Sequence, residues 1–157
     1  MRSWHARAMP TFVVRRHIAA PPEAVFAWLA DVRNYTASTA VLSTMWLRQT
    51  DHVVGGVGAV RELVTGLGWF RERIVGFEPG RALHYRIVAS IQPVLHEHGS
   101  VVLDPTDDGT EVVWTTTTAV RLPLVGGLVD RTALGPMIQL GFGDVLRACD
   151  RAVAGAA

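Results

Sequence analysis

Several stretches with the composition of β-strands follow one another through the middle of the chain, separated only by short turns. Residues 57–64, 69–75, 82–90, 95–103 and 110–120 are rich in β-branched and aromatic residues, and a further strand is expected near 45–49. Connections such as 65–68 and 77–80 are too short for a helical crossover. Consecutive strands are therefore expected to pair antiparallel as a meander.

The two ends of the chain add helices to this meander. Residues 11–18 alternate as a half-buried strand, and Pro21 and Pro22 with Glu23 predict a helix over 22–30. Residues 31–35 are interpreted as a second short helix or turn, and 36–39 carry no clear period. Near the C-terminus, apolar residues recur at spacings of three and four, which predicts a long amphipathic helix begun or kinked at Gly135 and Pro136: Ile138, Phe142, Val145, Leu146, Cys149, Ala152 and Val153.

This order of elements predicts an α+β fold. A curved antiparallel sheet of about seven strands can bury its concave face only against the last helix, with the two short helices after the first strand. Residues 1–9 are expected to form a flexible leader, and 10–155 a single domain.

Composition excludes several classes of protein. Of the 157 residues 49% are hydrophobic and 18% charged, which excludes disorder, and the net charge of +1 provides no field that would attract nucleic acid. The single cysteine, Cys149, cannot form an internal disulfide, which suits the cytoplasm. No apolar stretch is long enough for a membrane span. No phosphate-binding loop or other cofactor motif occurs, so no cofactor is expected.

Three motifs in the right order carry a family resemblance. They are IAAPPEAVFAWLAD at 18–31 followed by Tyr35, then FRERIV at 70–75 with PGRALHYR at 79–86, and finally DGTEVVW at 108–114. Together they resemble the SRPBCC superfamily, also called START-like or helix-grip proteins, in its polyketide cyclase/dehydrase branch. The resemblance implies a cavity between the sheet and the C-terminal helix, gated by the segment before and within that helix. It implies either a carrier or an enzyme.

Strand alternation selects the polar residues that could act in such a cavity. It places Glu97 on the inward face, and pairing across the 76–80 turn places Glu72 beside Tyr85. Buried carboxylates could serve as acid or base, and a tyrosine could donate to an oxyanion. Alternatively, Glu72 is a structural residue paired with one of the nearby arginines. A shift of one residue in register would reverse every inward assignment.

The histidines give a competing motif. His96 and His98 share one face of a strand and His84 could lie beside them, a pattern that some metal sites use. The apolar residues alternate on the opposite face, so the histidines are expected on the solvated surface. No metal site is expected.

Aromatic and apolar residues complete the predicted ligand contacts. The full set is Trp46, Phe70, Glu72, Tyr85, Ile87, Glu97, Trp114, Leu134, Met137 and Phe142. The first hypothesis is a monomer or homodimer that buries a lipid, isoprenoid or polyketide-like molecule. The second is a polyketide cyclase or dehydratase that uses Glu72, Glu97 and Tyr85. The third is a protein-interaction module that presents its histidines.

Overall fold

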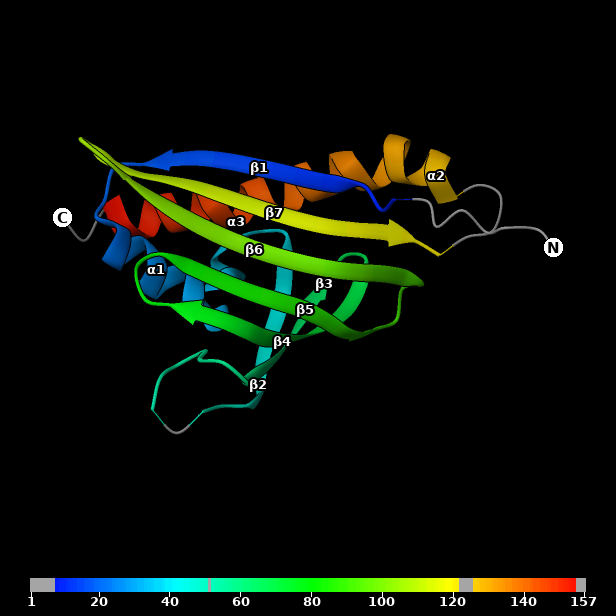
Figure 1. The fold of residues 1–157 in the computed structure, drawn as a ribbon, viewed down its shortest axis with the longest axis horizontal. Coiled ribbons are helices and arrows are strands. Elements are labelled where there is room, and N and C mark those ends of the chain that lie inside the picture. The colour runs from blue at the N-terminus through cyan, green and yellow to red at the C-terminus, as the bar shows by residue number, and fades with distance from the viewer. Residues whose placement is uncertain (1–7, 51, 122–125, 155–157) are drawn as a thin grey trace.

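The computed structural model describes residues 8–50, 52–121 and 126–154, in which a seven-stranded antiparallel sheet lies against one long C-terminal helix (Figure 1). The strands are β1 (Thr11–Ile18), β2 (Val41–Arg48), β3 (Val60–Thr65), β4 (Gly68–Glu78), β5 (Ala82–Ser90), β6 (Val94–Thr106) and β7 (Gly109–Val120). The helices are α1 (Pro22–Ala30), the 3-10 helix η1 (Val32–Ala37), α2 (Gly126–Val129), the π-helix η2 (Asp130–Leu134) and α3 (Gly135–Ala154). The predicted α+β helix-grip class is confirmed.

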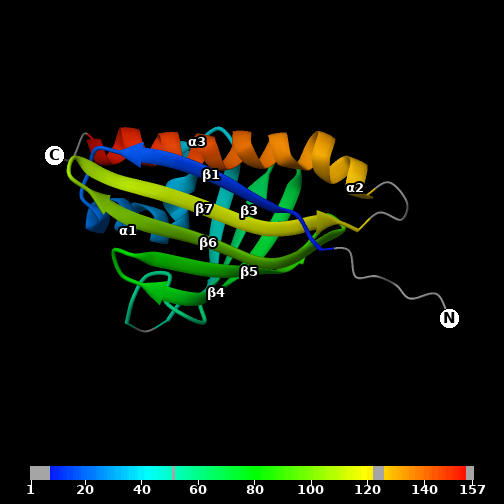
Figure 2. The same ribbon diagram turned by 45° about the horizontal axis from the view of Figure 1, so that its top comes forward.

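The sheet is a meander with the first strand added at one edge, beside the last strand. Its order is β1-β7-β6-β5-β4-β3-β2, so β2 to β7 pair with their neighbours in sequence. β1 pairs antiparallel with β7, with Val14 opposite Trp114. Figure 2 shows α3 running alongside β1, which brings the C-terminal helix over the sheet. The predicted antiparallel meander is thus confirmed.

Some predicted strand limits differ from those observed. The strand expected over residues 57–64 begins only at Val60, because Gly58 has a φ of +92°, a left-handed conformation that does not continue a strand. The strand expected near 45–49 begins earlier, at Val41, and β6 extends to Thr106. The segment 36–39, for which no period was found, contains the end of η1.

The first helices pack under the sheet through an apolar stripe. Pro21 is the N-cap of α1, Glu23 lies in its first turn, and Phe26 and Leu29 are buried. The side chain of Asp31 then caps η1 by accepting a 3.1 Å hydrogen bond from the backbone amide of Arg33. This pair of helices positions Tyr35 in the core.

A bulge in β6 reverses part of the predicted alternation. His96 pairs with Thr118, whereas His98 pairs with Thr117, so Glu97 is an extra residue in the strand. Glu97 and Leu95 are exposed, and His96 is turned toward the interior. The predicted inward position of Glu97 and outward position of His96 are therefore wrong.

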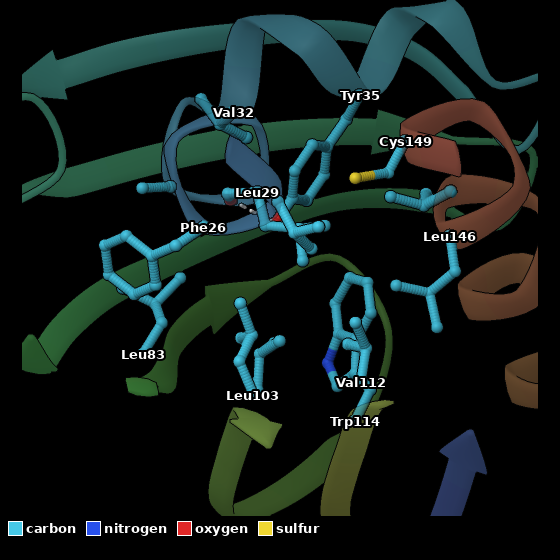
Figure 3. Close-up of a cluster of buried hydrophobic side chains, with 14 of the residues drawn as sticks. Phe26, Leu29, Val32, Tyr35, Leu83, Leu103, Val112, Trp114, Leu146 and Cys149 are labelled. Atoms are coloured by element: carbon cyan, nitrogen blue, oxygen red, sulfur yellow. Dashed lines mark hydrogen bonds between the residues drawn. The ribbon is translucent and has the colours of Figure 1, made fainter. Parts of the chain in front are cut away.

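The hydrophobic core lies where α1, η1 and α3 meet the sheet. Figure 3 shows Leu146 and Cys149 of α3 on one side of this cluster, with Tyr35 and Trp114 nearby. Cys149 is fully buried, and burial raises the pKa of its thiol to about 12. Within the described part of the chain, no helix is both long and apolar enough to cross a membrane.

Candidate ligand cavity

A cavity of about 610 Å³ lies between the sheet and α3. Its wall includes most of the residues predicted to contact a ligand, namely Phe70, Glu72, Tyr85, Ile87, Trp114, Leu134, Met137 and Phe142. The structure brings these side chains together from β4, β5, β7, η2 and α3. Their contact with a ligand remains a prediction.

Two of the predicted contacts lie elsewhere. Glu97 is exposed at the bulge of β6 and is not part of the cavity wall. Trp46 packs beside the turn at Gly55, and its Nε1 lies 3.4 Å from Oδ1 of Asp31, to which it donates. The ring of Trp46 therefore covers the start of η1 rather than the cavity.

Arg61 is the central polar residue of the cavity, and its position was not predicted. Its side chain is completely buried, and its Nε donates a 2.7 Å hydrogen bond to Oε2 of Glu72. The guanidinium carbon lies 5.3 Å from the ring centroid of Tyr35 and 5.5 Å from that of Tyr85. Such contacts with aromatic faces stabilise a buried cation. Alternation with the buried Leu63 was the signal that could have placed Arg61 inward.

The charge of Arg61 is maintained by its carboxylate partner. Burial alone would lower the pKa of Arg61, but the negative charge of Glu72 and the hydrogen bond to it raise that pKa above its ordinary value. The same pairing bears out the alternative in which Glu72 is bound to an arginine. Arg61 and Glu72 therefore form a buried ion pair in the cavity wall.

One donor of Arg61 is left over. Its Nη1 is buried and has no hydrogen-bond partner among the described residues. A buried donor without a partner costs free energy, about 1–3 kcal/mol for a typical group and more for a charged one. Because Arg61 belongs to the cavity wall, this unpaired donor lies beside the cavity.

Tyr85 is held by its neighbours and remains protonated. Its oxygen accepts a 2.9 Å hydrogen bond from Nε1 of Trp114, whose ring stacks on Phe142 at 4.2 Å. Burial is the main reason that the pKa of Tyr85 rises well above its usual value. Opposite Tyr85 on β6 is Gly99, where an added Cβ would collide with the tyrosine ring. The glycine gives the phenol ring its space.

His96 lines the cavity as a neutral side chain. Its Nδ1 accepts a 3.1 Å hydrogen bond from the backbone amide of Ile87, so the proton of the neutral ring is on Nε2, which donates to Oγ1 of Thr116 at 3.1 Å. Burial, followed by the nearby His98 and Arg86, lowers the pKa of His96 to about 4. Both ring nitrogens are therefore occupied at neutral pH.

His84 and His98, the other two histidines of the predicted cluster, are not part of the cavity wall. His84 Nδ1 and His98 Nε2 are 3.1 Å apart, and their rings are tilted toward each other. Desolvation, then His84 and Arg86, lower the pKa of His98. Among the described residues, no three His, Cys, Asp or Glu side chains come close enough to hold a metal ion.

Comparison with known proteins agrees with this architecture. The family model described as "Polyketide cyclase / dehydrase and lipid transport" matches residues 9–154. None of the curated proteins matches the chain.

Solved structures share the fold at low sequence identity. The chain is similar to TTHA0849 from Thermus thermophilus, with a TM-score of 0.76, 20% identity, and coverage of 94% of this chain and 99% of that one. It is similar to a START superfamily protein from Mycobacterium smegmatis, with a TM-score of 0.75, 12% identity, and coverage of 94% and 99%. It also resembles the di-domain ARO/CYC StfQ of the steffimycin biosynthetic pathway, with a TM-score of 0.77 and 15% identity, covering 95% of this chain and 52% of that one.

Proposed function

The chain belongs to the polyketide cyclase / dehydrase and lipid transport family, and we propose that its cavity binds a largely apolar molecule carrying one oxygen acceptor for Arg61. The observation that carries this proposal is the buried Nη1 of Arg61, which lacks a partner among the described residues. A bound oxygen would remove this unmet hydrogen bond. The apolar remainder of the molecule would be held by burial against the cavity wall.

The cavity has the size and character of a small-molecule site. Its volume of about 610 Å³ falls within the usual range for such pockets, roughly 300–1,000 Å³. Aromatic and aliphatic side chains such as Phe70, Ile87 and Phe142 supply most of the wall, and a few polar groups are gathered around Arg61. This combination supports binding by apolar burial, with orientation set by one polar contact.

The charge balance favours a neutral acceptor over a carboxylate. Arg61 and Glu72 together carry no net charge, and both are buried. A carboxylate ligand would add an uncompensated negative charge beside Glu72, which costs free energy in a poorly solvated site. A carbonyl or hydroxyl oxygen accepts the Nη1 hydrogen bond without that cost. The proposed ligand is therefore an apolar ketone, ester or alcohol.

Two fluorescent probes separate apolar burial from the polar contact. N-phenyl-1-naphthylamine lacks a carbonyl acceptor, whereas 6-propionyl-2-(dimethylamino)naphthalene is a ketone whose emission shifts to the red when its carbonyl accepts a hydrogen bond. The double variant R61M/E72L removes the donor without leaving an unpaired buried charge. We expect its Kd for the ketone to rise about tenfold with a blue-shifted emission, and its Kd for the amine to stay within about twofold.

A matched control is available on the same two strands. Glu62 and Arg71 form the neighbouring ion pair of the β3–β4 ladder, 2.9 Å apart and more exposed than the Arg61–Glu72 pair. The variant R71M/E62L carries the same substitutions outside the cavity wall and should bind both probes as the parent protein does. Equal affinity of the R61M/E72L variant and the parent for the ketone would refute the role of Arg61. Failure of the parent to bind either probe would refute the proposed function.

A second candidate function is cyclisation of a poly-β-ketone. The supporting observation is that an N–H donor and a carboxylate adjoin in the cavity wall, at Arg61 and Glu72. In this mechanism Glu72 takes a proton from the carbon beside a carbonyl, and Arg61 binds the enolate oxygen that receives the electron pair. The enolate carbon then attacks a second carbonyl, forming a carbon–carbon bond as the π bond of that carbonyl breaks, and the resulting alkoxide oxygen takes the proton from Glu72. Glu97 has no part in this version because it is exposed.

The two candidates differ in their dependence on Glu72. The substitution Glu72→Gln should abolish cyclisation of a poly-β-ketone and leave binding of N-phenyl-1-naphthylamine within about twofold, because the amide cannot take the proton. Unchanged product formation would exclude Glu72 as the base. The interaction module, in which histidines contact a partner, remains a prediction without further support.

A further inference from the structure

The ladder between β5 and β6 is incomplete. Their backbones pair from Ala82 opposite Val102 to Tyr85 opposite Gly99 and no further. β5 nevertheless continues its pairing with β4 as far as Ser90, and β6 is paired with β7 from Val94 onward. The sheet is therefore split between β5 and β6 at the end that holds the turn connecting them.

A second, smaller cavity of about 290 Å³ occupies this split. Its wall shares Ile87, Gln92, Pro93, Val94 and His96 with the main cavity. It also includes Val88, which is 46% exposed and follows Ile87 along β5. Because Val88 is exposed while Ile87 lines the main cavity, the smaller cavity reaches from the interior toward the surface of the protein.

The imidazole of His96 spans the split. Where a regular ladder would continue, the backbone amide of Ile87 on β5 donates to Nδ1 of His96 instead of to a carbonyl of β6. On the other side of the ring, Nε2 donates to Thr116 of β7, and the ring stacks on Tyr85 with centroids 5.6 Å apart. His96 thus belongs to the wall that the two cavities share, between strands that are not paired there.

The smaller cavity is lined by several polar side chains, and three of them are hydrogen-bonded within the protein. The hydroxyl of Ser90 donates to the carbonyl of Gln92, and the amide of Gln92 donates to the carbonyl of Leu67. His96 uses both ring nitrogens, as described above. These three side chains are already hydrogen-bonded to the protein, and the remaining polar side chain of the wall is that of Arg121, so the smaller cavity offers an apolar molecule little to retain it.

We propose that the split between β5 and β6 is a second entrance to the ligand cavity, closed by the side chain of His96. The entrance lets an apolar molecule exchange while α3 stays in place against the sheet. Arg86 bridges the strands nearby by donating from Nε to the backbone carbonyl of Glu97 at 3.0 Å, which holds them together while the imidazole moves. This inference rests on the proposed function, because an entrance needs a ligand.

Exchange kinetics test the entrance in the full chain. Stopped-flow mixing with N-phenyl-1-naphthylamine gives the association and dissociation rates. We expect His96→Ala to raise both by at least about fivefold, since opening a route lowers the barrier for entry and exit alike. The control His98→Ala removes a histidine outside the cavity wall, and should leave both rates unchanged.

Rates in His96→Ala within twofold of those of the parent protein, at a measurable Kd, would overturn the entrance and leave the proposed function intact. Absence of probe binding by the parent would instead overturn both.

Hydrogen exchange of the parent protein gives a test without a variant or ligand. The amide of Ile87 should exchange at least about tenfold faster than that of Ile74, which donates to the carbonyl of Ala59 within the sheet. Equal protection would show that His96 does not open independently.

Discussion

Arg61 and Glu72 face each other across the β3–β4 ladder, with Nε of Arg61 2.7 Å from Oε2 of Glu72 and both residues buried. Each charge has been removed from water, and each is balanced mainly by the other. A pair of this kind contributes little to stability as a whole, but either member alone is costly. Each charge of this pair can therefore be buried in the cavity wall without a large loss of stability only because the other charge is beside it.

Removing one member of the pair should therefore destabilise the folded protein more than removing both. The substitution Glu72→Leu leaves Arg61 buried without its carboxylate, and we expect it to lower the free energy of unfolding by about 3–5 kcal/mol. The double variant R61M/E72L should lie within about 1–2 kcal/mol of the parent protein. Urea unfolding measures both. A double variant as unstable as the single one would contradict this account.

His96 should make the protein less stable in mild acid. Its pKa is about 4 in the folded protein, against an ordinary value of 6.5, so the unfolded chain binds a proton that the folded chain rejects between these values. Stability should therefore fall as the pH drops from about 6.5 to about 4. The free energy of unfolding is expected to fall by about 2 kcal/mol over this range, allowing for the partial exposure of the His96 ring to solvent.

The substitution His96→Gln isolates this effect, because a glutamine amide can accept from Ile87 and donate to Thr116 but does not titrate. Urea unfolding at pH 4.5 and pH 7 should show a smaller difference for the variant than for the parent protein. If both proteins lose the same stability on acidification, His96 is not the group responsible.

Gly99 should tolerate no side chain. A Cβ at this position would collide with Cζ of Tyr85, whose oxygen is tied to Trp114. We expect Gly99→Ala to destabilise the protein by about 1–3 kcal/mol and to weaken probe binding, because the tyrosine ring must move within the cavity wall. Thermal unfolding and probe titration measure the two effects.

Gly143→Ala is the matched control for that prediction. An added Cβ there would meet only the flexible end of Arg147, at 3.6 Å, on the long helix α3. Replacing a helical glycine by alanine should stabilise the protein by roughly 0.5–1 kcal/mol. A Gly99→Ala variant as stable as the parent protein would show that the ring of Tyr85 can shift to another position without loss of stability.

Regular alternation made part of the cavity predictable. Glu72 on β4 and Tyr85 on β5 were placed inward from the pattern of apolar residues, and both line the cavity. The order of strands and the long helix followed from turn lengths and from spacings of three and four. These features depend on local periodicity, which a single sequence displays.

Features that interrupt periodicity were not predictable. The bulge at Glu97 adds one residue to β6 and exchanges the sides of Glu97 and His96, yet no turn residue marks it in the sequence. Arg61, by contrast, follows the alternation that buries Leu63, but its inward position was not predicted because an arginine is rarely buried unless paired, and its partner lies on another strand. Trp46 was assigned to the cavity as one of several aromatic residues, whereas its neighbours at Gly55 and Asp31 come from loops.

The alternating charges of β3 and β4 also carry information about how their hairpin assembles. The native register sets Arg61 opposite Glu72 and Glu62 opposite Arg71, two attractive pairs on opposite faces. A slip of one residue in one direction would set Arg61 opposite Arg73 and Glu62 opposite Glu72, and a slip in the other would set Arg61 opposite Arg71. Each error brings like charges together, which disfavours the misaligned hairpin before any core has formed around it. Arg61 and Glu72, which give the cavity its polar group, thus also favour the correct register of the two strands that carry them.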